Sequence, residues 1–162
     1  MNNHHKPRQI SAEFKADLEK ELAHLRTDIR PVIAERLKSA REGGDLTDNA
    51  AFEQAKEDLA RLMGRMSEIE QTLREAIVIH HNGNGKPSQV AVGTMVSVAR
   101  DDGRECCYKI VQTLEASPTD GKISDESPIG QALLGRKRGD TVSVQAPART
   151  NTYTITDIQY IH

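Results

Sequence analysis

The sequence predicts an α+β protein of two modules. An antiparallel helical coiled-coil hairpin is expected over residues 1–79, and a small antiparallel β-sheet domain with one helix over residues 80–162. Two observations support this division. Apolar residues recur every three or four positions in two arms that flank an acidic bend at residues 43–50. After residue 76 the spacing changes to the period of two that is typical of strands.

The two arms of the expected hairpin mirror each other across the bend. When apolar residues are paired outward from it, the two position numbers of each pair have a nearly constant sum. An antiparallel hairpin requires this, because one helix climbs as the other descends. The predicted pairs are Leu37 with Ala55, Ile33 with Leu59, Ile29 with Leu62, Leu25 with Met66, Leu22 with Ile69, and Leu18 with Leu73.

Each arm is expected to be one long helix. The first covers residues 11–42, with Ser11 as its N-cap. Pro31 lies inside this helix, where the missing N–H should kink or loosen it. The second helix runs from about Asp45 to Ala76. Arms of ~30 residues would be ~45 Å long at 1.5 Å per residue, so the bend is the tip of a rod.

The second module shows the pattern of a small sheet. Alternating apolar residues predict a pair of strands around an Asp-Asp-Gly turn, and two further strands at residues 141–145 and 152–158. Between these pairs a short helix is expected, with Ser127 as its N-cap, Pro128 as its first residue and Gly135 as its C-terminal stop.

Composition narrows the class of protein. Charged residues make up 28% of the chain, hydrophobic residues 36%, and tryptophan is absent. This favours an elongated protein with a limited core over an enzyme with a deep pocket. The net charge of −2 provides no general attraction to nucleic acid. Cys106 and Cys107 are expected to be reduced thiols of a cytoplasmic protein, and no apolar run reaches the length of a membrane span.

Asp45 and Asp48 are the candidate metal ligands. If the second helix begins at the bend, residues three positions apart lie on one of its faces. Two carboxylates that reach a common point are suitable hard ligands for Mg²⁺. The alternative is purely structural, because an aspartate at the N-cap followed by an acid three residues on is a variant of the capping box.

A basic patch lies behind the tip and could contact a few phosphates. The alternative is an ordinary solvated helix flank, balanced by nearby acids. The basic residues are Arg30, Arg36, Lys38, Arg41, Lys56, Arg61 and Arg65, and the balancing acids are Glu53, Glu57 and Asp58.

Two segments resemble the bacterial transcript cleavage factors of the GreA/GreB family, and GreA more closely. Residues 41–57 read REGGDLTDNAAFEQAKE, which is similar to the tip of the family's hairpin. Residues 123–140 read ISDESPIGQALLGRKRGD, which is similar to a stretch of the family's second domain. The resemblance extends over residues 11 to 160.

The resemblance implies a function at RNA polymerase. It implies an FKBP-like second domain that docks at the polymerase secondary channel, and a hairpin that carries its acids to the active centre. Asp45 and Asp48 match the functional acids, which would share Mg²⁺ with the polymerase and promote cleavage of nascent RNA in backtracked complexes. Arg41, Lys56 and Phe52 match positions expected to contact RNA or polymerase. The expected docking residues are Ser127, Pro128, Ile129 and Gly130.

Two departures from the family pattern occur at the tip. Asp48 replaces the usual Glu and is one methylene shorter, and Phe52 replaces the usual Tyr and lacks its hydroxyl. The chain is expected to be a monomer with no nuclease activity of its own. The alternatives are a non-catalytic regulator that binds the same channel and a peptidyl-prolyl isomerase. The isomerase would have only three tyrosines to line its pocket.

Overall fold

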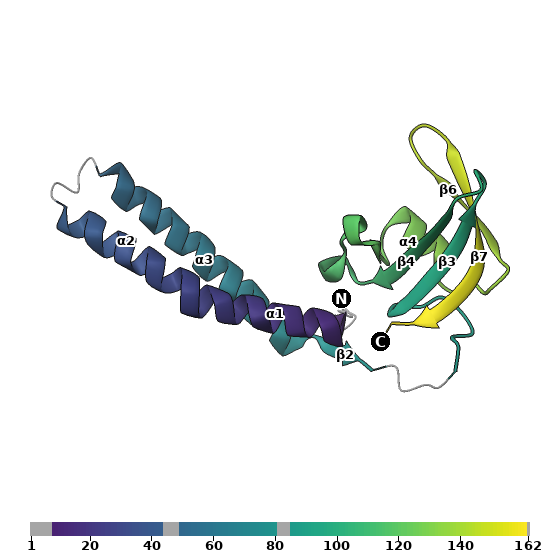
Figure 1. The fold of residues 1–162 in the computed structure, drawn as a ribbon, viewed down its shortest axis with the longest axis horizontal. Coiled ribbons are helices and arrows are strands. Elements are labelled where there is room, and N and C mark those ends of the chain that lie inside the picture. Colours follow the sequence, from purple (N-terminus) through teal and green to yellow (C-terminus); the bar gives the residue numbers. More distant parts are fainter. Residues whose placement is uncertain (1–7, 44–48, 81–84, 162) are drawn as a thin grey trace, which may run out of the picture. The chain divides into compact units, whose positions relative to one another are not determined.

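The computed structural model describes residues 8–43, 49–80 and 85–161 of the chain (Figure 1). The chain groups into two compact units. Residues 13–76 belong to the first unit, and residues 8–12 together with the chain from residue 77 onward belong to the second. The sequence places the division between residues 79 and 80, whereas the contacts place it between residues 76 and 77.

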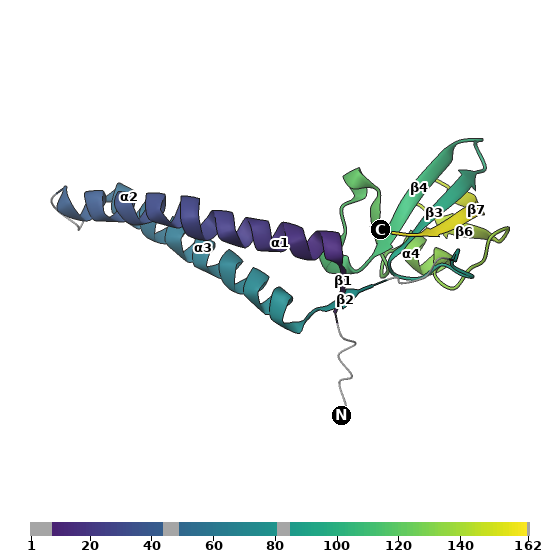
Figure 2. The same ribbon diagram turned by 60° about the horizontal axis from the view of Figure 1, so that its bottom comes forward.

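The first unit is the helical hairpin. Its first arm is continuous helix from α1 (Ala12–His24) through a π-helical turn (Leu25–Ile29) to α2 (Arg30–Glu42). Its second arm is α3 (Ala50–Glu75). The two arms lie side by side in both views (Figures 1 and 2).

Pro31 explains the π-helical turn in the first arm. A proline has no N–H and its ring clashes with the carbonyl four residues earlier, so the regular hydrogen-bond ladder cannot continue through it. The N–H of Arg30, just before the proline, bonds the carbonyl of Leu25, five residues back. The expected loosening at Pro31 is therefore confirmed, and it takes the form of a widened turn rather than a break.

Ten of the twelve mirrored apolar residues form the seam between the two arms, as predicted, and Leu37 and Ala55 lie outside its apolar cluster. Burial of such residues supplies most of the stability of a helix pair, because isolated helices are marginal in water. Two ion pairs join the arms beside the seam: Arg26 with Glu70 at 2.6 Å and Arg65 with Glu21 at 2.7 Å. The buried seam residues are Leu18, Leu22, Ile33, Leu62, Met66 and Ile69, and the flanking ones are Phe14, Leu25, Ile29, Leu59 and Leu73.

The second unit contains a five-stranded sheet in the order β5-β4-β3-β7-β6. The strands are β3 (Thr94–Arg100), β4 (Glu105–Val111), β5 (Lys122–Ser124), β6 (Thr141–Gln145) and β7 (Thr150–Tyr160). Neighbours are antiparallel except β4 and β5, which are parallel. The predicted antiparallel sheet is thus correct for all of its pairs but this one.

One short helix, α4 (Pro128–Leu133), completes the core of the second unit. Ser127 is its N-cap and Pro128 its first residue, as predicted. Gly135 follows it with a φ of 74°, which favours glycine. The core residues are Val90, Val96, Val98, Ile110, Leu133, Val142, Tyr153, Ile155 and Ile158. No helix within the described ranges is long and apolar enough to cross a membrane.

A second, two-stranded sheet also belongs to this unit. Strand β1 (Gln9–Ser11) pairs in parallel with β2 (Ile77–Ile79) (Figure 2). In this pairing Gln9 lies opposite Ile77. β1 ends where α1 begins, and β2 begins two residues after α3 ends. The sequence did not predict β1, because three residues are too few to show a period of two.

Candidate functional site

Asn49 organises the end of the hairpin. It is the N-cap of α3, and its side-chain oxygen accepts a hydrogen bond from the N–H of Phe52 at 3.2 Å. Its side-chain nitrogen donates to the carbonyl of Ala40 in α2 at 2.7 Å. One side chain therefore caps one helix and ties it to the other. The chain leaves α2 at Gly43, so only residues 44–48 separate the tied ends.

Asp45 and Asp48, the predicted metal ligands, lie outside the described residues. The helix α3 begins at Ala50, with Asn49 as its N-cap. The sequence predicts a start at about Asp45, five residues earlier than the structure shows. Four potential capping residues occur between positions 45 and 49, and only the last caps the helix.

The basic residues behind the tip differ in their surroundings. Lys56 lies 3.3 Å from the carboxylate of Glu53, and its ammonium is 5.5 Å from the centroid of the Phe52 ring. Such a cation–π contact is worth about 0.5–1 kcal/mol at an exposed site. Arg41 is exposed in the last turn of α2. The structure thus brings Lys56 and Phe52 together on the first turns of α3.

Part of the expected basic patch is paired with acids of its own helix. Arg61 bonds Asp58, which also accepts a hydrogen bond from Gln54 at 3.0 Å. The hydrogen bonds from Gln54 and Arg61 lower the pKa of Asp58, and the positive charge of Arg36 adds to the effect. At Arg61 and Asp58 the helix surface therefore fits the alternative of a solvated surface on which acids balance the basic residues.

The four expected docking residues form the start of α4, and they divide into two kinds. The Ser127 hydroxyl donates to the carbonyl of Ser124 at 2.7 Å and accepts from the N–H of Gly130 at 3.1 Å. Gly130 is buried, and a Cβ there would lie 2.0 Å from the Ser124 carbonyl oxygen. Ser127 and Gly130 therefore build the turn, whereas Pro128 is exposed on it and Ile129 packs against the core.

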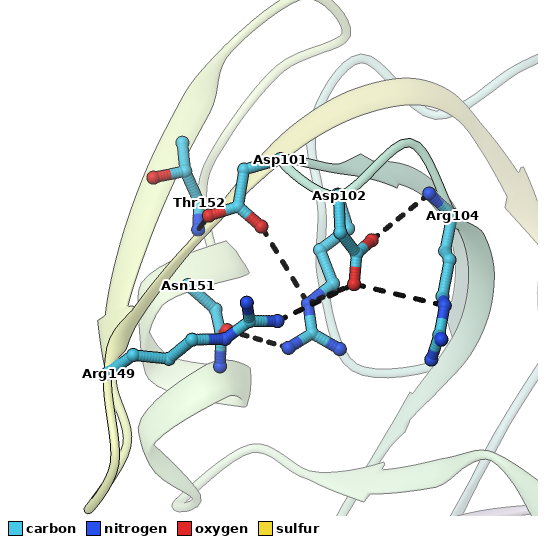
Figure 3. A network of polar contacts seen from close by, with 7 residues as sticks. Asp101, Asp102, Arg104, Arg149, Asn151 and Thr152 are labelled. Atoms are coloured by element: carbon cyan, nitrogen blue, oxygen red, sulfur yellow. Dashed lines mark hydrogen bonds and ion pairs between the residues drawn. The ribbon is translucent and has the colours of Figure 1, made fainter.

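The sequence did not predict a network of polar side chains in the second unit. It joins the turn after β3 to the start of β7 (Figure 3). The guanidinium of Arg100 donates to Asn151 at 2.7 Å and its Nε lies 3.5 Å from Asp102. Asp102 also accepts from the N–H of Arg104 at 3.1 Å and pairs with Arg149 at 3.5 Å.

The charges in this network largely neutralise one another. Loss of solvent tends to raise the pKa of Asp102, but the hydrogen bond from Arg104 and the charges of Arg100, Arg104 and Arg149 outweigh it and lower that pKa. Asp101 connects the same turn to β7, because its carboxylate accepts from the N–H of Thr152 at 3.4 Å. The network thus connects the β3–β4 hairpin to the β6–β7 hairpin, and both of its carboxylates have hydrogen-bond or ion-pair partners within it.

The cysteines are free, as expected. Cys106 is half-buried beside Tyr108, whose ring meets that of Tyr153 edge-on at 6.4 Å. Burial, followed by the hydrogen bond with Cys106, raises the pKa of Tyr108 to about 12. Among the residues that the structure describes, no group of three or more His, Cys, Asp or Glu side chains is placed to hold a metal ion.

These elements define a two-module protein: a helical hairpin whose arms are joined by the hydrogen bond of Asn49 to Ala40, and a small β-domain with one short helix. Sequence comparison gives the family. The chain belongs to the GreA/GreB family of transcription elongation factors, because the family's N-terminal domain matches residues 8–78 and its C-terminal domain matches residues 85–160. The resemblance seen in the two sequence segments is thereby confirmed.

Named relatives agree over nearly the whole length. The chain is 43% identical to transcription elongation factor GreA of Roseiflexus sp. (strain RS-1) over 156 residues, covering 95% of this chain and 98% of the relative. It is 44% identical to GreA of Thermoanaerobacter pseudethanolicus over 144 residues, covering 88% and 91%. Among solved structures it is similar to GreA factor homolog 1 of Thermus thermophilus, with 26% identity, a TM-score of 0.43, and coverage of 95% and 99%.

Proposed function

We propose that this chain binds bacterial RNA polymerase and stimulates Mg²⁺-dependent cleavage of the RNA 3′ end in backtracked, arrested complexes. The observation that carries the proposal is the match of both domains to the elongation factor family, together with the acidic tip sequence at the end of a tied hairpin. The polymerase would supply the RNA and most of the active centre. The chain itself would act as a cofactor of the polymerase rather than as an enzyme.

The tip residues would supply part of the metal environment. Carboxylate oxygens are the hard donors that Mg²⁺ prefers, so Asp45 and Asp48 fit this ion chemically. Two carboxylates are too few for a complete site, which is why the polymerase must contribute ligands. When bound there, the ion would lower the pKa of a water and stabilise charge on the leaving oxygen. The role of this chain is to bring the carboxylates to the RNA and to hold them in place.

The hairpin has the construction that such delivery needs. α3 has 26 residues, which corresponds to a length of ~39 Å at 1.5 Å per residue. The buried seam, which includes α3 residues from Leu59 to Leu73, and the ion pair between Arg65 and Glu21 keep the two arms together over this part of the hairpin. At the far end Asn49 bonds Ala40, so the short segment that carries the two acids is closed at its base.

Replacing the acids tests the proposal. Asp45→Asn and Asp48→Asn should each abolish stimulated cleavage and leave polymerase binding nearly unchanged, because each removes a metal ligand at the tip and leaves the second domain intact. Glu57→Gln is the matched control, since Glu57 is an exposed acid of α3 that carries no assigned role in cleavage. Cleavage that survives both asparagine variants would refute the role of the acids.

A second function is favoured by the departures at the tip. Asp48 is shorter than the family's usual Glu, and Phe52 lacks the hydroxyl of the usual Tyr. A tip with reduced reach could occupy the channel without promoting cleavage, which would make the chain a non-catalytic regulator of the polymerase. Asp48→Glu discriminates between the two. A gain of cleavage from a wild type that has little would support the regulator, whereas a strongly active wild type would exclude it.

A further inference from the structure

Glu115 is a buried acid that the proposed function does not use. It is the last residue of a 3-10 turn (Thr113–Glu115) in the second unit, and it is only 6% exposed. Burying a carboxylate is costly unless partners compensate for the lost water. A buried acid of this kind therefore indicates a specific contact, and its partners show what that contact holds.

The partners of Glu115 lie mainly on strand β1. The hydroxyl of Ser11 donates to one carboxylate oxygen at 2.6 Å, and the N–H of Ser11 donates to the other at 3.2 Å. The ammonium of Lys122 lies 3.6 Å from the first oxygen and is itself largely buried. Three residues earlier, the side-chain oxygen of Gln112 accepts a hydrogen bond from the N–H of Gln9 at 2.6 Å. Residues 112–115 thus hold both ends of β1, and we call these hydrogen bonds of Gln112 to Gln9 and of Glu115 to Ser11 the grip.

The gripped strand is the starting point of the hairpin. Ser11 is followed directly by Ala12, the first residue of α1. Ile10, between the two gripped residues, is 1% exposed. β1 also pairs with β2, the strand that follows α3. The chain therefore enters and leaves the hairpin through one small two-stranded sheet, and the contacts of Gln112 and Glu115 hold the entering strand to residues 112–115 of the same unit.

Without this grip the hairpin would have one attachment rather than two. The pairing of β1 with β2 and the covalent connection after β2 would remain, but β1 would no longer be held to residues 112–115. A chain held at a single point explores many more arrangements than one held at two, and ordering it again costs conformational entropy. A cleavage factor needs its tip at one place, so the second attachment has a functional consequence.

We propose that Glu115 is a positioning residue of the cleavage factor: through Ser11 it fixes the start of the hairpin, and this attachment is required for the tip to act at the polymerase. The inference rests on the proposed function for its last step only. The first step, that Glu115 holds β1, stands on the contacts themselves.

Amide hydrogen exchange on the full chain tests the first step. Ser11→Ala removes the shorter hydrogen bond and keeps the backbone N–H as a reporter. Exchange at Ser11 and at Ile10 should become at least about tenfold faster, which is the effect expected from losing a hydrogen bond to a charged group. Ser11→Thr restores the hydroxyl and should restore slow exchange. Glu105→Gln, at an exposed acid on β4, is the control and should change nothing.

Single-turnover cleavage tests the second step with the same variants. Ser11→Ala and Glu115→Gln should lower the cleavage rate at saturating factor, with the half-saturating factor concentration changed less than about twofold, because the expected docking turn is not altered. Ser11→Thr should recover the rate. Tyrosine fluorescence, which reports only the second unit, should show that unit to be folded in every variant.

Each outcome decides one step. Unchanged exchange in Ser11→Ala would overturn the grip. Faster exchange with an unchanged saturated rate would show that the grip is structural only, and would overturn the positioning role. A loss of binding with an unchanged saturated rate would assign Glu115 to docking instead. If the wild type itself produced no cleavage, the proposed function and the positioning step would both be refuted, and the exchange result would still decide the grip.

Discussion

Gly130→Ala is the substitution whose effect can be worked out most directly from the structure. A Cβ at this position would lie 2.0 Å from the carbonyl oxygen of Ser124 and 3.0 Å from its carbonyl carbon. Ordinary contact begins at 3.4 Å, so α4 and the end of β5 would have to separate by roughly 1.4 Å. Neither side can rotate away, because the obstructing atoms belong to the backbone.

The separation also breaks local hydrogen bonds. The same Ser124 carbonyl accepts the hydroxyl of Ser127, which in turn caps α4 by accepting from the N–H of Gly130. Overpacking alone costs about 1–3 kcal/mol, and the loss of a cap adds about 1 kcal/mol. A total of ~3 kcal/mol would lower the Tm of a unit of this size by ~12 °C or more.

The chain offers a selective probe for this measurement. All three tyrosines lie after residue 76 and there is no tryptophan, so tyrosine fluorescence follows unfolding of the second unit alone. Far-UV circular dichroism at 222 nm follows mainly the hairpin. Gly130→Ala should lower the tyrosine-detected Tm and leave the hairpin transition unchanged.

Gly64→Ala is the matched control. Gly64 is exposed within α3, and a Cβ there meets no atom within 4 Å. The same chemical change should stabilise the hairpin by about 0.5–1 kcal/mol, because glycine is a poor helix former. A Gly130→Ala variant with wild-type stability in the second unit would refute the reasoning, since it would mean that the turn at α4 can move at little cost.

Two further predictions concern a helix cap and acid stability. Asn49→Ala removes the hydrogen bond to the N–H of Phe52 and should destabilise the hairpin by ~1 kcal/mol in thermal unfolding, and wild-type stability would show that the cap is dispensable. Hydrogen bonds from Gln159 and then Lys86 lower the pKa of Asp157 to about 2. Because this folded-state pKa lies below the usual value of 3.8, its stabilisation is present above pH ~4 and is lost as the pH falls toward 2. Tyrosine-detected unfolding of Lys86→Met should show a weaker acid dependence than the wild type, and an identical profile would contradict the assignment.

The hairpin was predictable because its pattern is long and regular. Six positions per arm at helical spacing define an apolar face, and the mirrored order predicts which residues meet. Pro31 was equally informative, because a proline inside a helix has a fixed chemical consequence. The turn at Ser127 could also be predicted, since Ser, Pro and Gly occur there in the order that a short helix needs.

The start of the second helix was harder to predict, for a physical reason. Asp45, Thr47, Asp48 and Asn49 are all good N-cap residues, so local propensity does not choose among them. Asn49 is the cap in the structure, and its side chain also reaches Ala40 in the other arm. That second bond is a tertiary contact, which a pattern along one segment does not contain.

The grip of Glu115 on Ser11 was missed for a similar reason. The two residues are separated by 104 positions, and each looks ordinary in its own segment. β1 and β2 have three residues each, which is too short for a strand pattern. What defines them is pairing between distant parts of the chain, and only a three-dimensional structure brings those parts together.

The measurement that tests the central claim most directly is RNA cleavage in a stalled, backtracked elongation complex of the cognate polymerase. With Mg²⁺ present, the full chain should shorten the labelled RNA from its 3′ end faster than the polymerase does alone, and the Asp45→Asn, Asp48→Asn double variant should bind the complex without this effect. A wild-type chain that binds the complex and leaves the rate of RNA shortening unchanged would contradict the account and identify a non-catalytic regulator.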